Sequence, residues 1–196
     1  KTQRWTPDMT RILKTKFASV VVASAIGTQV AGETSAGTPI TMDNLVANAD
    51  MIRISDSIDA AVDAKHWARA RSFFTEEIRV DLTSLVGGEP ATIPADALIA
   101  GWSTNLTAEK RSFHLRGNHR ITFEGENTAT MVSHGYAWNH MERGALSENG
   151  GEALWEVWGE YTHGFVKTED GWRVNKMSFF ATAERGNPFV RNTPGQ

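Results

Sequence analysis

Apolar residues return at helical spacing in the first half of the chain. Over residues 42–64 they recur every three or four positions, which predicts a long amphipathic helix. A second, short helix is predicted over residues 65–74. Pro94 stands just before a third predicted helix, residues 95–106, at a position where its missing N–H is not needed. We therefore expect three helices in the first half of the chain.

Alternation of apolar and polar residues dominates the second half. One half-buried strand is predicted at residues 76–85. Four more strands follow, separated by turn signals such as Asp170-Gly171. Their expected bounds are 111–124, 127–141, 152–168 and 172–184. Helices followed by a long antiparallel meander predict an α+β class, specifically a cone-shaped α+β barrel with three N-terminal helices packed on a curved, mainly antiparallel sheet. Such a cone leaves a cavity beneath its helices that suits a small molecule.

The predicted domain spans residues 42–185, between an N-terminal extension, 1–41, and an irregular tail, 186–196. Within the extension, residues 9–36 place basic side chains before an apolar stretch that ends in small and polar residues. This order is typical of a secretory signal peptide and predicts export to the periplasm or the medium. The alternative is an added helix or a flexible extension on a cytoplasmic protein. The apolar stretch is too short and too interrupted to span a membrane, so no stable membrane insertion is expected.

Composition narrows the classes of function. With 20 Lys and Arg against 23 Asp and Glu, the formal net charge is −3, and no basic run indicates a nucleic-acid partner. Seven Trp and nine Phe suggest a large apolar interior or pocket. The sequence has no cysteine, which excludes disulfides, thiolate nucleophiles and zinc–thiolate sites.

The six histidines lack the spacing of a metal site, so no metal is predicted. His134 and His140 lie six positions apart on one predicted strand and therefore share a face with Tyr136 and Trp138. These side chains would meet other histidines only through contacts between strands.

His114 and Asp63 each have two interpretations. Plain alternation puts His114 on the solvent face, whereas a β-bulge at Gly117 would place it on the same face as His119. Asp63 is positioned to cap the short helix that follows it. Alternatively its carboxylate turns inward and orients a histidine, because a carboxylate partner fixes the tautomer and raises the basicity of an imidazole.

Three stretches together resemble a known family: VDAKHWARARSFFTEEIRVDL, FHLRGNHRITFEG and YTHGFVKTEDGWRV. They are similar to the SnoaL-like branch of the nuclear transport factor 2-like superfamily, and within it to scytalone dehydratase and hexachlorocyclohexane dehydrochlorinase. The resemblance covers about residues 42–185. It implies the cone-shaped fold, a homo-oligomer of two or three copies, and chemistry without a cofactor.

In those two enzymes an aspartate after the first helix pairs with a histidine on a strand, and the histidine removes a proton from carbon. The resemblance assigns these roles to Asp63 and His114, and that of a second catalytic histidine to His140. Val62 and Leu82 stand where scytalone dehydratase has tyrosines. Neither named activity is therefore expected to carry over whole.

The expected function is a cofactor-free lyase or isomerase acting on a small, largely apolar, cyclic molecule. The predicted walls of its pocket are aromatic: Trp67, Tyr136, Trp138 and Tyr161. One alternative is a non-catalytic module of the same fold that binds a small molecule or mediates assembly. Another is the structural small subunit of a ring-hydroxylating dioxygenase. The fold by itself does not decide among these functions.

Overall fold

The structure, a computed structural model, describes residues 36–142 and 151–195. The predicted signal peptide, residues 9–36, lies outside these ranges except for its last residue, and export stays a prediction. No helix within the described ranges is long and apolar enough to cross a membrane.

Helices and strands follow the predicted order, with three short additions. The helices are α1 (Leu45–Asp63), α2 (Trp67–Arg71), α3 (Thr83–Val86), α4 (Ala95–Asn105) and α6 (Pro188–Asn192). The strands are β1 (Phe74–Asp81), β2 (Ala91–Pro94), β3 (Arg111–Phe123), β4 (Thr128–His140), β5 (Leu154–Thr168) and β6 (Gly171–Gly186). The additions are α3, β2 and α6. The strand predicted at residues 76–85 ends at Asp81, and α3 takes the place of its last part. The tail that was expected to be irregular thus contains a helix, because the Asn187 side chain accepts the N–H of Phe189 at 3.0 Å and caps α6.

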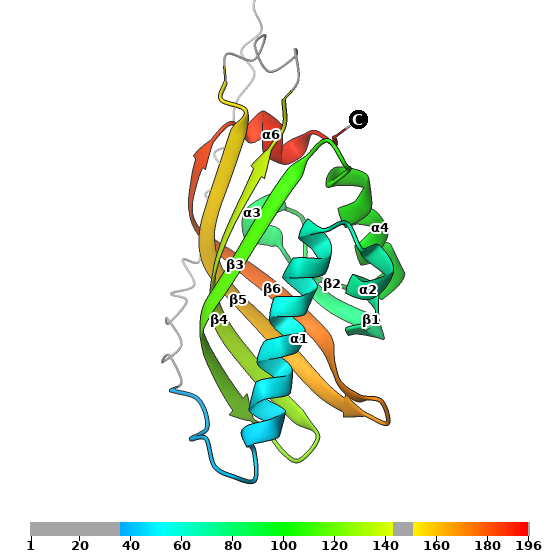
Figure 1. The fold of residues 1–196 in the computed structure, drawn as a ribbon, viewed down its shortest axis with the longest axis vertical. Helices are drawn as coiled ribbons and strands as arrows, with labels where there is room; N and C mark the ends of the chain where they lie inside the picture. Colours follow the sequence, from blue (N-terminus) through cyan, green and yellow to red (C-terminus); the bar gives the residue numbers. More distant parts are fainter. Residues whose placement is uncertain (1–35, 143–150, 196) are drawn as a thin grey trace, which may run out of the picture. The chain divides into compact units, whose positions relative to one another are not determined.

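The strands form one curved sheet in the order β2-β1-β6-β5-β4-β3 (Figure 1). β1 pairs with β6 in parallel, and every other neighbouring pair is antiparallel. α1 packs against β3 and β6, and the short α2 and α4 pack against each other beside β1. The predicted α+β class with a curved, mainly antiparallel sheet is confirmed. The sheet does not close into a barrel, because β2 and β3 form its two edges.

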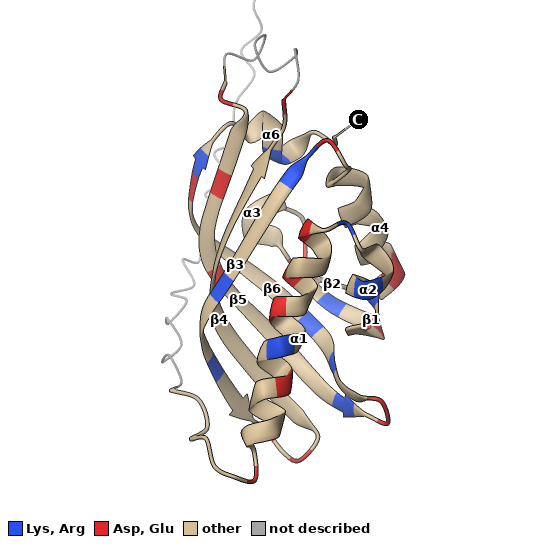
Figure 2. Ribbon diagram, viewed as in Figure 1, with Lys and Arg blue, Asp and Glu red and all other residues tan. Residues whose placement is uncertain are grey.

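Apolar packing fixes the face that α1 turns toward the sheet. Met51 and Ile58 on α1 are buried in one cluster with Phe165 on β5. Each fully buried side chain of this kind contributes roughly 1.5–3 kcal/mol to stability. Asp59 lies beside Ile58 and is itself buried. The same packing therefore aims acidic side chains of α1 at the sheet, and acidic positions recur along this helix (Figure 2).

The predicted bulge at Gly117 is confirmed. Pairing of β3 with β4 shifts between Gly117 and Arg120, and Asn118 adopts a φ of 54°. Asparagine visits this left-handed conformation more readily than most residues. The bulge brings His114 and His119 to the same face of β3, where each lies beside an aspartate of α1.

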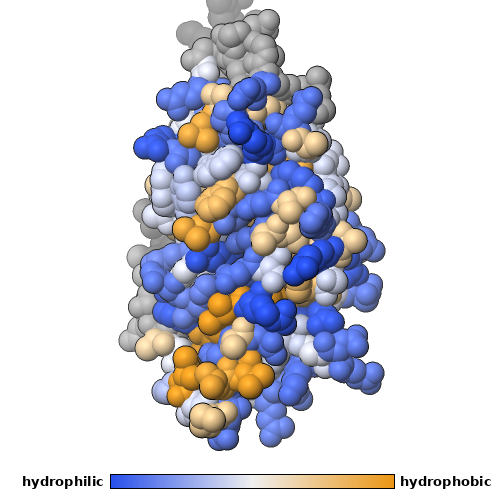
Figure 3. All heavy atoms as spheres, viewed as in Figure 1, coloured by the Kyte–Doolittle hydropathy of each residue, from blue (hydrophilic) through white to orange (hydrophobic). Residues whose placement is uncertain are grey.

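The molecular surface on the α1 side is mostly hydrophilic (Figure 3). Apolar side chains gather at one end of this face, around the beginning of α1, where Ile40, Met42 and Val46 are exposed. The polar contacts between α1 and β3 lie further along the helix, toward its C-terminal end.

Candidate active site

Asp63 is the last residue of α1, and the chain changes direction directly after it. The N–H of Lys65 donates to the carbonyl of Val62 at 3.0 Å, and that of His66 donates to Ala61 at 2.8 Å. This is the Schellman pattern of a helix C-terminus. The N-cap residue of α2 is His66, and no side chain caps that helix. Asp63 therefore does not cap α2, and its carboxylate is directed at β3.

The Asp63 carboxylate accepts three hydrogen bonds from β3. One oxygen, Oδ1, accepts from His114 Nδ1 at 2.7 Å and from the Ser112 hydroxyl at 2.9 Å. The other, Oδ2, accepts the backbone N–H of His114 at 2.8 Å. Burial raises the pKa of the Asp63 carboxyl, but the hydrogen bonds and charge of His114, together with Ser112, outweigh burial and leave it below its usual value. Asp63 is therefore ionised at neutral pH.

His114 is oriented by this carboxylate. Since an ionised carboxylate can only accept, the proton of a neutral His114 ring sits on Nδ1. The other ring nitrogen, Nε2, then carries a lone pair, and it makes no hydrogen bond with the described residues. The side chains of His114 and Asp63 are 18% and 20% exposed, so the pair is shielded but not sealed from solvent. This arrangement suits a general base.

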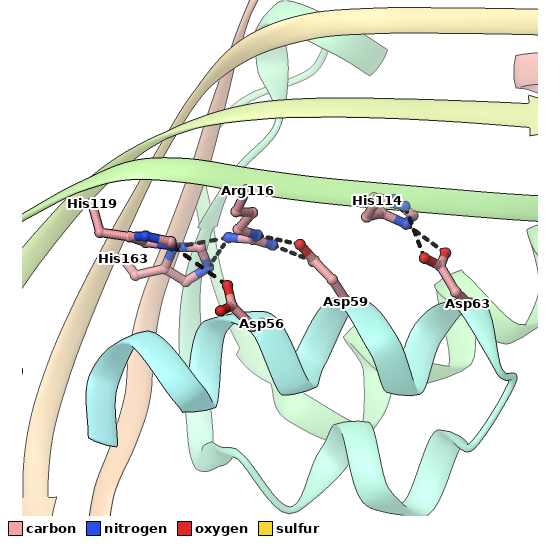
Figure 4. A network of polar contacts seen from close by, with 7 residues as sticks. All are labelled: Asp56, Asp59, Asp63, His114, Arg116, His119 and His163. Atoms are coloured by element: carbon pink, nitrogen blue, oxygen red, sulfur yellow. Dashed lines mark hydrogen bonds and ion pairs between the residues drawn. The ribbon is translucent and has the colours of Figure 1, made fainter. Parts of the chain in front are cut away.

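A second, more deeply buried pair lies one turn earlier on α1 (Figure 4). Both oxygens of Asp59 accept from the Arg116 guanidinium, at 2.5 and 2.6 Å, and these side chains are only 9% and 3% exposed. Arg116 Nη1 also lies 3.1 Å from Nε2 of His163. Burial, and then the charge of Arg116, holds the pKa of His163 well below its usual range, so this ring is neutral.

His119 and Asp56 form a third, looser contact in the same row. Their atoms Nε2 and Oδ1 lie 3.5 Å apart, which is too far for a good hydrogen bond. Burial is the largest cause of the lowered pKa of His119. Three aspartates of α1 thus face three basic side chains of β3 (Figure 4). Among these three pairs, only Asp63 and His114 form a hydrogen bond between a carboxylate and an imidazole.

Tyr161 on β5 faces the same interior. Its ring lies 3.8 Å from the Arg116 guanidinium carbon and 4.4 Å, between centroids, from Phe179. Burial raises the pKa of Tyr161 to about 12, with smaller contributions from Asp59 and Asp63 that Arg116 opposes. The phenol therefore keeps its proton and can donate a hydrogen bond. Trp67, on α2, packs against the core, with the Lys65 ammonium 5.9 Å from its ring centroid.

A family model described as a SnoaL-like domain matches residues 44–178. The chain belongs to the SnoaL-like family. A search of curated proteins finds no match. Among solved structures, the SnoaL-like chain is similar to the Kfla4162 protein of Kribbella flavida, with 24% identity, a TM-score of 0.68, and coverage of 74% of this chain and 97% of that one.

Two further structures are similar to this SnoaL-like chain. A scytalone dehydratase-like protein of Novosphingobium aromaticivorans has 20% identity and a TM-score of 0.64, over 76% of this chain and 92% of that one. A hexachlorocyclohexane dehydrochlorinase of Novosphingobium barchaimii has 13% identity and a TM-score of 0.58, over 74% and 92%. At these identities the likeness establishes the shared fold.

The structure separates three of the predicted site residues from the dyad of Asp63 and His114. His140, Tyr136 and Trp138 point to the opposite face of the sheet, because β4 places its odd-numbered residues inward and His114 pairs with Ala137. Placing these three in one pocket with His114 is therefore wrong. His140 Nδ1 instead lies 2.9 Å from Arg111 Nη2. On that same outer face, Tyr136 donates to Glu156 at 2.6 Å, and Trp138 stacks on Phe113 with 6.0 Å between ring centroids.

Ser112, Arg116 and Lys65 were not singled out from the sequence, although each contacts the row of aspartates or its partners. The available signal was the spacing of Asp56, Asp59 and Asp63, which puts all three on the face of α1 that turns toward β3, although only Asp59 is buried. Acidic residues on a buried face require donors from another element. Within the described residues, no three His, Asp or Glu side chains gather as metal ligands.

Proposed function

We propose that this SnoaL-like protein is a lyase or isomerase that removes a proton from a carbon atom of a small, largely apolar, cyclic molecule without a cofactor. The observation that supports this proposal is the 2.7 Å contact between His114 Nδ1 and Asp63 Oδ1, which leaves Nε2 as the base nitrogen. Two similar structures carry names that denote eliminations, a dehydratase and a dehydrochlorinase.

The proposed step begins with a lone pair on His114 Nε2 taking a proton from the substrate carbon. The ring becomes an imidazolium whose charge Asp63 stabilises. The electron pair of the broken C–H bond then forms a carbon–carbon double bond and expels a leaving group from the neighbouring atom, which is a lyase reaction. In an isomerase, a carbonyl accepts the pair and the proton returns elsewhere. The phenol of Tyr161 is the proposed donor to that carbonyl or leaving group.

The surroundings of the dyad favour an apolar substrate. Ala137, the cross-strand neighbour of His114, is buried in a cluster with Val157 and Phe179, and Leu82 packs against this cluster. A charged molecule would lose its hydration there without a compensating partner. We therefore expect rings with one carbonyl, hydroxyl or halogen rather than phosphorylated or acidic compounds.

The test is exchange of substrate C–H for deuterium, followed by proton NMR in heavy water. Cyclic ketones, hydroxylated aromatic compounds and halogenated rings form the panel. We expect exchange or elimination with at least one class, and a loss of about 10²–10⁴-fold in rate for His114→Ala and Asp63→Asn. His134→Ala is the matched control, because His134 is exposed on the outer face of β4. Full turnover by His114→Ala would refute the mechanism.

The second candidate function is a ligand-binding or assembly module of the same fold. The observation that favours it is the filling of the interior beside the dyad by Arg116, His163 and Tyr161. This candidate predicts that panel compounds bind without exchange, and that His114→Ala leaves their binding unchanged. Association with a large iron–sulfur subunit would instead identify a dioxygenase small subunit.

Self-association into a dimer or trimer also belongs to this proposal. The outer face of the sheet carries exposed Phe113, Leu115, Trp158 and Phe180, an apolar surface of the kind that contacts between subunits cover. Sedimentation equilibrium of the purified protein measures its mass directly. A monomer at all concentrations would contradict this part of the proposal.

A further inference from the structure

Lys65 occupies a backbone position that favours glycine. Its φ is 58°, and it is the residue after the C-cap in the Schellman turn that ends α1. Glycine is the usual residue there because a Cβ is strained in this left-handed conformation. A lysine at this position keeps the strain that a glycine would avoid.

The Lys65 side chain returns toward the dyad. Its ammonium donates to the Ser112 hydroxyl at 2.8 Å, and that hydroxyl donates to Asp63 Oδ1 at 2.9 Å. An ammonium has no acceptor, so Ser112 must accept from Lys65 and send its own proton to Asp63. The direction of every hydrogen bond from Lys65 to His114 is thereby determined. Burial lowers the pKa of the Lys65 ammonium, and the charge of Asp63 partly restores it.

The hydrogen bonds from Lys65 through Ser112 to Asp63 matter because they bring a positive charge close to the Asp63 carboxylate. While His114 is neutral, the shielded Asp63 carboxylate has no charged partner in the dyad itself, and a shielded lone charge is costly. The other nearby cations are committed elsewhere. Arg116 is paired with Asp59, and the Lys110 ammonium donates to three oxygens near the C-terminal end, those of Asn105, Arg191 and Thr193.

We propose that Lys65 is a positioning residue of the dyad, which balances the charge of Asp63 through Ser112 and holds its carboxylate against His114. The importance of this role for turnover rests on the proposed function. The effect of the Lys65 charge on Asp63 does not rest on the proposed function, because it is present in the resting protein without substrate.

The first test therefore needs no substrate. The carboxyl carbon of Asp63 is titrated by carbon-13 NMR in the full-length protein and in Lys65→Met and Lys65→Gly. An opposite charge nearby commonly lowers the pKa of a carboxyl by 1–3 units, roughly, and so we expect the proton affinity of Asp63 to rise about tenfold in both variants. A titration curve for Lys65→Met that superimposes on that of the unmodified protein overturns the proposal.

Urea unfolding provides a second measurement, which separates the side chain from the backbone. Lys65→Gly relieves the left-handed strain, so its unfolding midpoint should exceed that of Lys65→Met. Asn118→Gly is the matched control, because Asn118 has a φ of 54° on β3 but lies outside the dyad. It should leave the Asp63 titration unchanged. A change in that titration with Asn118→Gly would mean that backbone relief, not the ammonium, governs Asp63.

With a panel compound that undergoes exchange, both Lys65 variants should lose about 10- to 100-fold in kcat with KM unchanged, since the lysine does not contact substrate. The experiments distinguish failure of the proposed function from failure of the proposed role of Lys65. If His114→Ala retains turnover while the Asp63 titration shifts as expected, the proposed function fails and the charge balance stands. If His114→Ala is inactive but the Lys65 variants match the unmodified protein in kcat and in the titration, the role of Lys65 is refuted alone.

Discussion

Replacing Asp59 by Asn leaves the Arg116 guanidinium buried without a counter-charge. Arg116 is 3% exposed, and its two bonds to Asp59, 2.5 and 2.6 Å, are charge-assisted. Each such bond contributes about 1.5–3 kcal/mol, and breaking one side of a buried ion pair costs about 3–5 kcal/mol. We expect a loss in this range for Asp59→Asn, which is a large share of the roughly 5–15 kcal/mol that stabilises a typical domain.

Urea unfolding followed by tryptophan fluorescence measures this loss. The matched control is Asp50→Asn on the same helix, whose pair with Arg53 is exposed and 3.3 Å long, and which should cost less than about 1 kcal/mol. Replacing both partners, as Asp59→Leu with Arg116→Met, should recover much of the loss, because no uncompensated charge remains. Equal losses for Asp59→Asn and Asp50→Asn would refute the assignment of Arg116 as a buried, paired charge.

Three further predictions test the interior. Because the pKa of His163 is low in the folded protein, the unfolded chain binds a proton below about pH 6.5 that the folded protein does not. The free energy of unfolding should therefore fall on acidification by up to ~1.4 kcal/mol per pH unit. His163→Phe should flatten this slope in urea titrations between about pH 5 and 8. An unchanged slope would contradict the burial of a neutral ring. Lys110→Met leaves three oxygen acceptors without their donor, so we expect a loss of about 1–3 kcal/mol and faster amide exchange over residues 191–195, measured by mass spectrometry. Protection equal to that of the unmodified protein would show that Lys110 does not hold this segment. Gly135→Ala would place a methyl group against the Tyr161 ring, so it should lower both the unfolding midpoint and turnover, whereas Gly101→Ala, where nothing lies within 4 Å, should lower neither.

Local patterns in the sequence were enough to predict the elements that carry the dyad. The apolar period of residues 42–64 predicts α1 because its buried stripe follows the helical repeat. Gly117 allowed a bulge in β3, because an extra residue is tolerated where a side chain is absent, but alternation left both faces open for His114. The pairing of Asp63 with His114 was expected from the resemblance to the SnoaL-like family and not from these patterns alone.

The face of each strand that the helices cover was not predictable from alternation. On β4 the parity that groups His140 with Tyr136 and Trp138 is correct, yet alternation does not say whether that group faces inward. Its aromatic side chains suggested a pocket. In the structure, smaller inward residues such as Ala137 accommodate the elements packed on the inner face, while the aromatic residues lie on the outer face. Only the packing of α1 and α3 settles this choice, and it depends on distant contacts.

The burial of Arg116 beside the dyad was not predicted, for a related reason. An arginine on a strand is usually exposed, and Arg116 becomes a core residue only because Asp59 reaches it from a helix 57 positions earlier. The residues next to Arg116 in the sequence do not indicate such a long-range pairing. The spacing of Asp56, Asp59 and Asp63 on one face of α1 was the one visible sign, because a carboxylate that a helix turns toward the sheet needs a donor opposite.

Under the proposed function, the same construction between α1 and β3 serves structure at one position and chemistry at another. Asp59 with Arg116 and Asp63 with His114 are each a carboxylate of α1 facing a base of β3, but their exposure differs, at 9% and 3% against 20% and 18%. A sealed arginine pair cannot exchange a proton with a substrate, because the guanidinium never gives up its charge and no molecule reaches it. At the end of the helix the chain turns away, the side chains are more exposed, and the base is an imidazole, which can accept a proton on its unbonded ring nitrogen. Chemistry is therefore expected where the helix ends, and the buried pair one turn earlier keeps helix and strand in register for it.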